Sequence, residues 1–215
     1  TFSELREVFS AATSGDLEVT EKADGINMFF TVDSSGNTRF ARNSTEIKNG
    51  GLTQAKMTSN YRGHGAERPF AEGVEAISQL VSKDYWPLGF SRKNWVNCDM
   101  IHKEHPQTLH YSECAIVIHN ASAWSAGKRL SRVDLSKQFN ILAENISQHT
   151  VPVNGLSWHG YGPIKVELPD VRGSGISTEA EAAFRVIFEN TGLDWESTLE
   201  DFTYYSLMAG AVGDL

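Results

Sequence analysis

The 215 residues are enough for one large domain, or for a domain with an appended subdomain, and a hydrophobic content of 40% is ordinary for a globular protein. The formal net charge of −8 argues against binding of nucleic acid through a broad basic surface, although residues 39–48 or 128–137 carry enough arginine and lysine for a local basic groove. No apolar run reaches the roughly 18 residues that a membrane helix needs, so we expect no membrane partner. The two cysteines, Cys98 and Cys114, are too few for a disulfide framework, which indicates a reducing compartment such as the cytoplasm.

The spacing of apolar residues predicts helices and strands in the first half of the chain. Apolar residues at helical spacing predict a helix at residues 3–13. Alternating residues then predict a hairpin, with one strand at Leu17–Val19, a tight turn, and a second strand at Ile26–Val32. The same rules predict a turn at 33–37, a strand at Thr38–Arg42, a loop at 60–65, a helix at about 69–82, and strands at 94–101 and 114–119.

After residue 125 the pattern becomes mainly helical. We expect a helix at about 131–148 and short strands at Val151–Val153 and Ile164–Leu168. Thr178-Glu179-Ala180-Glu181 and Ser197-Thr198-Leu199-Glu200 have the form of capping boxes that open two more helices. With a hinge at Gly173–Gly175, these features predict a core at residues 1–125 and a mainly helical extension or subdomain at 126–215.

The expected hairpin presents a lysine, Lys22, in the sequence Glu21-Lys22-Ala23-Asp24-Gly25-Ile26-Asn27. A lysine becomes a nucleophile when its ammonium group is desolvated or lies near another cation, because either change lowers its pKa. At a strand end, between two carboxylates, Lys22 is well placed for such chemistry. Without other motifs, a solvated surface lysine in a hairpin is the better interpretation of the same residue.

Glu21-Lys22-x-Asp24-Gly25 resembles the nucleotide-accepting motif of the covalent nucleotidyltransferases, which include DNA ligases, RNA ligases and mRNA capping enzymes. In that superfamily the lysine attacks the α-phosphate of a nucleotide and forms a lysyl-nucleotide phosphoramidate. Asn27, where DNA ligases commonly have arginine, is similar to RNA ligases. The resemblance implies an α+β fold with a mixed, mostly antiparallel nucleotidyltransferase sheet, ATP-grasp-like in its ligase form, and helices on its outside.

The resemblance also implies roles for residues further along the chain. Arg42 is at the place of an arginine that contacts the ribose, and Asp99 is at the place of an acidic residue that faces the ribose or a metal ion, where family members more often have glutamate. With Ala41-Arg42-Asn43, Lys48-Asn49-Gly50-Gly51 and the string from Asp99 to Asn120, residues 15–125 resemble an uncharacterised family of tailed-phage proteins built on the ligase pattern.

Two later motifs of the superfamily are not found in the sequence. Glu181-Ala182-Ala183-Phe184 lies in a helical pattern where a Glu-Gly strand would be needed, and Ile164-Lys165-Val166-Glu167 has one lysine where a Lys-x-Lys strand would be needed. Because phosphoryl transfer depends on neutralising developing negative charge, these residues matter for catalysis. We expect the chain to be the front part of a longer polypeptide, to fill these roles with other residues, or to have lost catalysis.

Two functions therefore remain open. In the first, the protein is an ATP-dependent polynucleotide ligase or nucleotidyltransferase that uses Mg²⁺. Lys22 forms lysyl-AMP, AMP then moves to a 5′-phosphate of RNA or DNA, and nucleotide contacts come from Glu21, Asp24, Gly25, Asn27, Arg42 and Asp99. In the second, it is a non-catalytic phage protein that binds phage structural proteins, in the host cytoplasm or in the virion.

A structural metal site is a weaker alternative. Cys98, Asp99, His102, His105 and His110 lie close together in the sequence, but they match no zinc-binding spacing. Cys98 and Asp99 are also neighbours in an expected strand, so their side chains should point to opposite faces. Ordinary loop histidines explain this cluster better.

Overall fold

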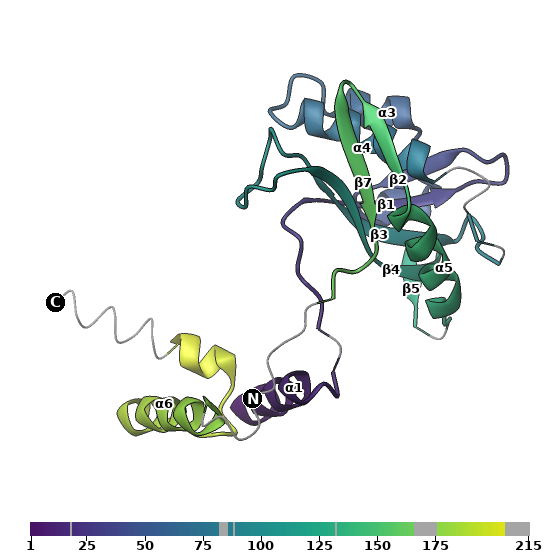
Figure 1. Ribbon diagram of the computed structural model, residues 1–215. Coiled ribbons are helices and arrows are strands. Elements are labelled where there is room, and N and C mark those ends of the chain that lie inside the picture. Colours follow the sequence, from purple (N-terminus) through teal and green to yellow (C-terminus); the bar gives the residue numbers. More distant parts are fainter. Residues whose placement is uncertain (18, 82–85, 88, 132, 166–175, 205–215) are drawn as a thin grey trace. The chain divides into compact units, whose positions relative to one another are not determined.

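A computed structural model describes residues 1–17, 19–81, 86–87, 89–131, 133–165 and 176–204 (Figure 1). The chain divides into two compact units. Unit 1 consists of Thr1–Thr20 and Lys165–Leu215, and unit 2 consists of Glu21–Ile164. The boundary expected near residue 125 therefore falls inside unit 2. The expected hinge at Gly173–Gly175 lies outside the described residues.

Unit 2 is a mixed α+β unit built on a seven-stranded, mostly antiparallel sheet. The strand order is β2-β1-β3-β4-β7-β6, β5 pairs with β4, and only the β4–β7 pair is parallel. The strands are β1 (Ile26–Val32), β2 (Thr38–Ala41), β3 (Asn94–Ile101), β4 (Cys114–Ser125), β5 (Lys128–Leu130), β6 (Thr150–Val153) and β7 (Leu156–Tyr161).

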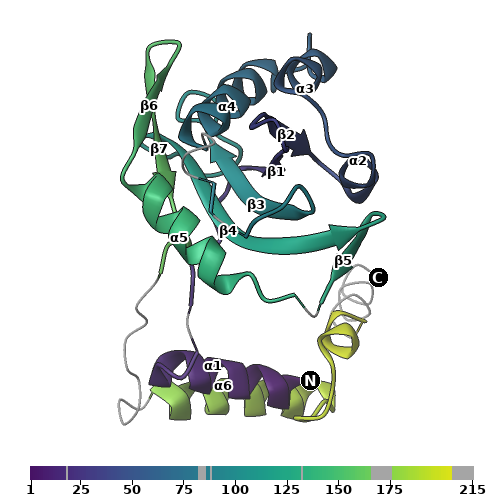
Figure 2. The same ribbon diagram turned by 90° about the vertical axis from the view of Figure 1, so that its right-hand side faces the viewer.

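The main hydrophobic core lies on one face of this sheet. Alternate residues of β1 and β3, such as Met28 and Cys98, are fully buried there. The opposing side chains come from α3, α4 and α5, with Met57, Ile77 and Leu142 as fully buried examples. Figure 2 shows α5 beside β4 and β7. The helices of unit 2 are α2 (Ser44–Lys48), α3 (Gln54–Asn60), α4 (Glu67–Leu80) and α5 (Ser136–Ser147).

Unit 1 contains α1 (Phe2–Ser14) and α6 (Ile176–Thr191), which lie side by side in Figure 2. Phe2 is buried and meets the rings of Phe184 and Phe188 edge-on, at centroid distances of 5.6 and 5.4 Å. The segment after α6 is tied to the start of α1, because the Ser3 N–H donates to the carbonyl of Trp195 at 2.9 Å. Aromatic contacts therefore hold this small unit together.

Several expected elements are confirmed. The helices expected at 3–13 and 69–82 are α1 and α4, the loop at 60–65 is a series of turns, and the strands at 26–32, 94–101 and 151–153 are β1, β3 and β6. The strands expected at Thr38–Arg42 and 114–119 are β2 and β4, and the helix expected at 131–148 is the shorter α5.

The expected helix start near residue 197 is also confirmed, one residue later. The Thr198 hydroxyl accepts the Asp201 N–H at 3.1 Å, and the Asp201 carboxylate accepts the Thr198 N–H at 2.7 Å. This reciprocal pair is a capping box, and residues 199–204 are helical. The box expected at Thr178 is wrong, because α6 already begins at Ile176.

The strand expected at Leu17–Val19 is wrong. The helix α1 ends at Ser14, Gly15 takes the left-handed conformation with φ 79°, and the Leu17 N–H donates to the carbonyl of Ala11 at 3.0 Å. Leu17 therefore completes the end of a helix, and the backbone group that a strand would need is already used. The expected hairpin would have placed Lys22 in a tight turn. In the structure Lys22 instead lies in an irregular segment before β1.

The expectation of a mainly helical extension from residue 126 is wrong for residues 126–164, which add β5, β6 and β7 to the sheet. The strand β7 was missed although the two-residue turn Asn154-Gly155, with φ values of 48° and 81°, joins it to β6 in an antiparallel hairpin. It pairs in parallel with β4, with Cys114 opposite Trp158, and its six residues include a glycine. Of the strand expected at Ile164–Leu168, Ile164 and Lys165 are described and the rest lies outside the described residues.

Candidate functional site

The second face of the sheet carries a group of polar side chains between two small apolar clusters. One cluster contains Ala23, Ile101, Ala115 and Val117, and the other contains Ala41, Ile47 and Trp95. The polar side chains between them come from β1, β3 and β4. We call this group the polar strip, and it consists of Asn27, Asn97, Asp99, His119 and Asn120.

The register of β1 against β3 places Asn27 opposite Asp99. Directly opposed residues of an antiparallel pair have Cβ atoms about 4.5–5.5 Å apart and project to the same face. Asn27 is exposed, and its amide nitrogen donates to the side-chain oxygen of Asn97 at 2.7 Å. The structure thus brings Asn27 and Asp99 together, as a shared nucleotide site would require.

Asp99 is nearly buried, with 9% of its surface exposed, and it is bonded to a histidine. The Nε2 atom of His119 lies 3.0 Å from Oδ2 of Asp99. Since an ionised carboxylate only accepts hydrogen bonds, Nε2 carries the proton in this contact.

A β-bulge positions this histidine. Cys98 pairs with Ile118 and Asn97 pairs with Asn120, which leaves His119 as the extra residue of β4. Bulges redirect side chains, and this one lets His119 reach the carboxylate of Asp99 on the neighbouring strand. His119 was not singled out from the sequence. The sequence signal that could have identified His119 is its place in an expected strand, on the same face as Ala115 and Val117.

Arg42 reaches the polar strip from the end of β2. Its guanidinium donates to the backbone carbonyl of Asn27 at 2.7 Å, and Cζ lies 5.1 Å from the centre of the Phe70 ring. The exposed Arg42 side chain is therefore held by a hydrogen bond and by a cation–π contact. Its position next to Asn27 agrees with the expected role in ligand binding.

Gly25 allows β1 to approach β3 closely at this site. A Cβ atom on Gly25 would lie 2.9 Å from both the Cβ of Asp99 and the carbonyl oxygen of Met100. Real Cβ atoms essentially never come that close, so any other residue would push the strands apart. The glycine of the expected motif is thus required by its contact with the acidic residue of the same site.

Lys22 and Glu21 are exposed and lie in the irregular segment that leads into β1. The backbone on either side of Lys22 is anchored. The Glu21 N–H donates to the carbonyl of Ile164 at 2.8 Å, and Ala23 is buried in the first small apolar cluster. The lysine side chain therefore projects from a fixed backbone three residues before Gly25.

Asp24 anchors the loop between β3 and β4. Its Oδ2 accepts the backbone N–H groups of Thr108 and Leu109, both at 2.7 Å, and its own N–H donates to the hydroxyl of Tyr111 at 3.0 Å. The hydrogen bonds from Leu109 and Thr108 lower the pKa of the Asp24 carboxyl, and the charge of Lys22 also lowers it, whereas desolvation acts in the opposite direction. These bonds fix the local chain around Asp24.

A second polar group, also not singled out from the sequence, lies where β4 begins and β7 ends. The Tyr161 hydroxyl donates to Glu113 at 2.6 Å, which raises the pKa of Tyr161 to about 12. His159 lies 3.7 Å from the other oxygen of the same carboxylate. Pairing of β7 with β4 creates this group, so a sequence reading that missed β7 could not find it.

The fold does not bring the residues considered for a metal site together as one ligand set, although the His102 and His105 rings meet edge-on at a centroid distance of 4.9 Å. Cys98 is fully buried in the main core, and Asp99 faces the other side of the sheet, as strand alternation predicts. His102 is buried and bonds Glu72 at 2.9 Å. Among the described residues, no group of three or more His, Cys, Asp and Glu side chains is arranged to hold a metal ion.

Of the two segments compared with the later ligase motifs, one lies within the described residues and the other does so only in part. Glu181 to Phe184 belong to α6, as their helical pattern predicted, whereas residues 166 and 167 lie outside the described part.

No helix in the described ranges is long and apolar enough to cross a membrane. Comparisons of the chain with protein-family models, curated proteins and solved structures found no match.

Proposed function

We propose that unit 2 is a nucleotidyltransferase sheet that binds ATP over the polar strip, and that Lys22 becomes covalently linked to AMP. The observation that carries this proposal is the convergence of Gly25, Asn27, Arg42 and Asp99. Asn27 and Asp99 come from β1 and β3, Gly25 directly precedes β1, and Arg42 directly follows β2; they lie in contact or directly opposite one another. They are the same residues that the resemblance to ligases selects as nucleotide contacts.

The chemistry of these side chains suits a nucleotide. Arg42 offers a cation and N–H donors beside Asn27, and the amide of Asn27 can orient a hydroxyl or phosphate oxygen. Asp99 has one oxygen bonded to His119, and its other oxygen has no hydrogen-bond partner among the described residues. That oxygen can accept a ribose hydroxyl, while Glu21 and the backbone near it would read the edge of the base.

In the covalent step, Lys22 reacts as a neutral amine, so its ammonium group first loses a proton. The Nζ atom attacks the α-phosphorus, an N–P bond forms, the bond from the α-phosphorus to the bridging oxygen breaks, and pyrophosphate leaves with that oxygen. Mg²⁺ bound to ATP would neutralise phosphate charge, and Mg²⁺ commonly takes only one or two protein carboxylates. Asp99 fits that limited role.

AMP on Lys22 would then pass to a 5′-phosphate of RNA or DNA, followed by sealing to a 3′-hydroxyl. The chain has a net charge of −8, so we expect nucleic-acid binding to be local to the basic side chains. The non-catalytic alternative, a phage protein that uses the same sheet only as a binding surface for phage structural proteins, is tested by the same experiments.

Equilibrium binding of ATP to the full chain tests this proposal. We expect Arg42→Ala to weaken ATP binding about tenfold or more, because charge-assisted hydrogen bonds contribute roughly 1.5–3 kcal/mol. Arg62→Ala is the matched control, since Arg62 is exposed in the turn after α3. Equal affinities for the two variants would reject the polar strip as the nucleotide site and favour the non-catalytic function.

A further inference from the structure

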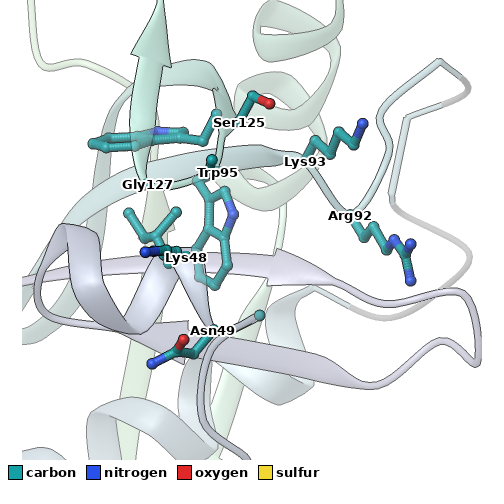
Figure 3. Close-up of a pocket in the computed structure, with 11 residues that line it drawn as sticks. Lys48, Asn49, Arg92, Lys93, Trp95, Ser125 and Gly127 are labelled. Carbon is teal, nitrogen blue, oxygen red and sulfur yellow. The ribbon is translucent and has the colours of Figure 1, made fainter.

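A cavity lies where α2, the chain entering β3 and the β4–β5 turn meet (Figure 3). Its volume is about 370 Å³, and two tryptophans, Trp95 and Trp124, line it. We call it the indole pocket. None of the polar strip residues lines it, so it is a separate feature of unit 2.

The inner wall of the indole pocket is rigid. Trp95 is only 2% exposed, and Gly51 passes so close that a Cβ atom there would lie 2.6 Å from the ring. Gly127, in the β4–β5 turn, has φ 78° and packs against Lys48, where a Cβ atom would lie 3.0 Å away. Because the main chain packs directly on these side chains, the pocket is pre-formed, as small-molecule sites usually are.

Among the described residues, three cations and no acidic side chain line the indole pocket. Figure 3 shows Lys48 on one side of the Trp95 ring, and Arg92 and Lys93 on the other. None of the three forms an ion pair with another described residue, although the chain as a whole carries a net charge of −8. An anion entering the pocket would therefore meet positive charge that is not already neutralised.

We infer that the indole pocket binds a phosphate ester of a planar ring compound, with the ring against an indole and the phosphate on Arg92 and Lys93, which lie on the same side of the Trp95 ring. Indole rings pack favourably against flat aromatic groups, and ammonium and guanidinium groups are the side chains that bind phosphate. A volume of about 370 Å³ is near the lower end for ligand sites, which suits one nucleotide unit. That unit can be a free nucleotide or one nucleotide of a single strand. This second site goes beyond the proposed function, because it does not involve Lys22 or the polar strip.

The test measures binding of AMP, adenosine, inorganic phosphate and a short single-stranded oligonucleotide to the full chain by calorimetry. We expect the double variant Lys48→Gln, Lys93→Gln to weaken binding of AMP or of the oligonucleotide at least about tenfold, and added salt to weaken it further. Adenosine and inorganic phosphate should each bind more weakly than AMP. Tighter binding of the oligonucleotide than of AMP identifies a strand as the source of the ligand, and equal binding identifies the free nucleotide.

The matched control is the double variant Lys56→Gln, Lys137→Gln, which removes two exposed lysines from α3 and α5 and leaves the lining of the pocket intact. Unchanged AMP and oligonucleotide binding in the pocket variant, or binding of inorganic phosphate as tight as that of AMP, would overturn the inference. Arg42→Ala separates the two sites. Binding that survives Arg42→Ala but not the pocket variant supports the indole pocket even if the proposed function fails, and the reverse pattern rejects the pocket alone.

Discussion

Gly25→Ala is the substitution that most directly links the packing of the sheet to the candidate site. The added methyl group would lie 2.9 Å from the Cβ of Asp99 and from the carbonyl oxygen of Met100, whereas ordinary contacts begin at 3.4 Å. Both obstacles belong to β3 at or next to its backbone, so neither can rotate away. The strands must separate by about half an ångström or distort.

Overpacking of this kind typically costs 1–3 kcal/mol, and we expect about 2 kcal/mol here because the obstacles are rigid. Each kcal/mol corresponds to about 2–4 °C in a domain of this size, so the unfolding temperature should fall by about 4–8 °C. Because Asp99 is one of the displaced groups, affinity for ATP should fall as well.

Thermal unfolding followed by circular dichroism measures this effect in the full chain. Gly65→Ala is the matched control, because a Cβ atom at Gly65 has no neighbour within 4 Å and the residue does not have a positive φ. That control should unfold at or slightly above the wild-type temperature. If Gly25→Ala unfolds at the wild-type temperature too, β1 and β3 do not approach as closely as the structure indicates.

Three further predictions concern the core, a buried histidine and the loop anchor. Leu142→Ala should lower the free energy of unfolding by about 2–5 kcal/mol in denaturant titrations, because Leu142 is fully buried, whereas Ile141→Ala on the same helix should cost far less, since Ile141 is 41% exposed. Burial lowers the pKa of His102 below its ordinary value of 6.5, against the raising effect of its bond to Glu72, so the unfolded state binds the proton more readily. Stability should therefore fall as pH drops through about 6.5, and His102→Gln should flatten this dependence in unfolding curves recorded at several pH values; an equally steep dependence in the variant would contradict this. Asp24→Ala removes the acceptor of two backbone N–H groups in the loop between β3 and β4, so hydrogen exchange of Thr108 and Leu109 should quicken at least about tenfold, and unchanged exchange would show that the loop is held elsewhere.

Strands with strict alternation were predicted, whereas β7 was missed although the Asn154-Gly155 turn that joins it to β6 is a short-range hairpin signal. The pattern of Asn94 to Ile101 predicted β3 with both ends correct, because every second side chain enters the core. Leu17 alternates with its neighbours in the same way, but the cap of α1 uses its backbone N–H. Local patterns do not include such competition for backbone hydrogen bonds, nor the parallel pairing that joins β7 to β4.

The candidate site, too, could be predicted only in part from the sequence. Alternation alone puts Asn27 on one face of its strand and Asp99 on one face of another, but only the register places them opposite each other. The contact of His119 with Asp99 depends on a bulge, and the bond from Arg42 to the carbonyl of Asn27 depends on the path of the chain after β2. The indole pocket is built from segments far apart in the sequence, so its three cations had no common signal.

The proposed function depends on a reaction of Lys22 with ATP. The most direct measurement is the intact mass of the protein after incubation with ATP and Mg²⁺, for the wild type, for Lys22→Ala and for Lys56→Ala as a matched lysine control on α3. We expect a mass increase of one AMP in the wild type and in Lys56→Ala, and none in Lys22→Ala. An unmodified wild-type protein, or an adduct that persists in Lys22→Ala, would contradict it.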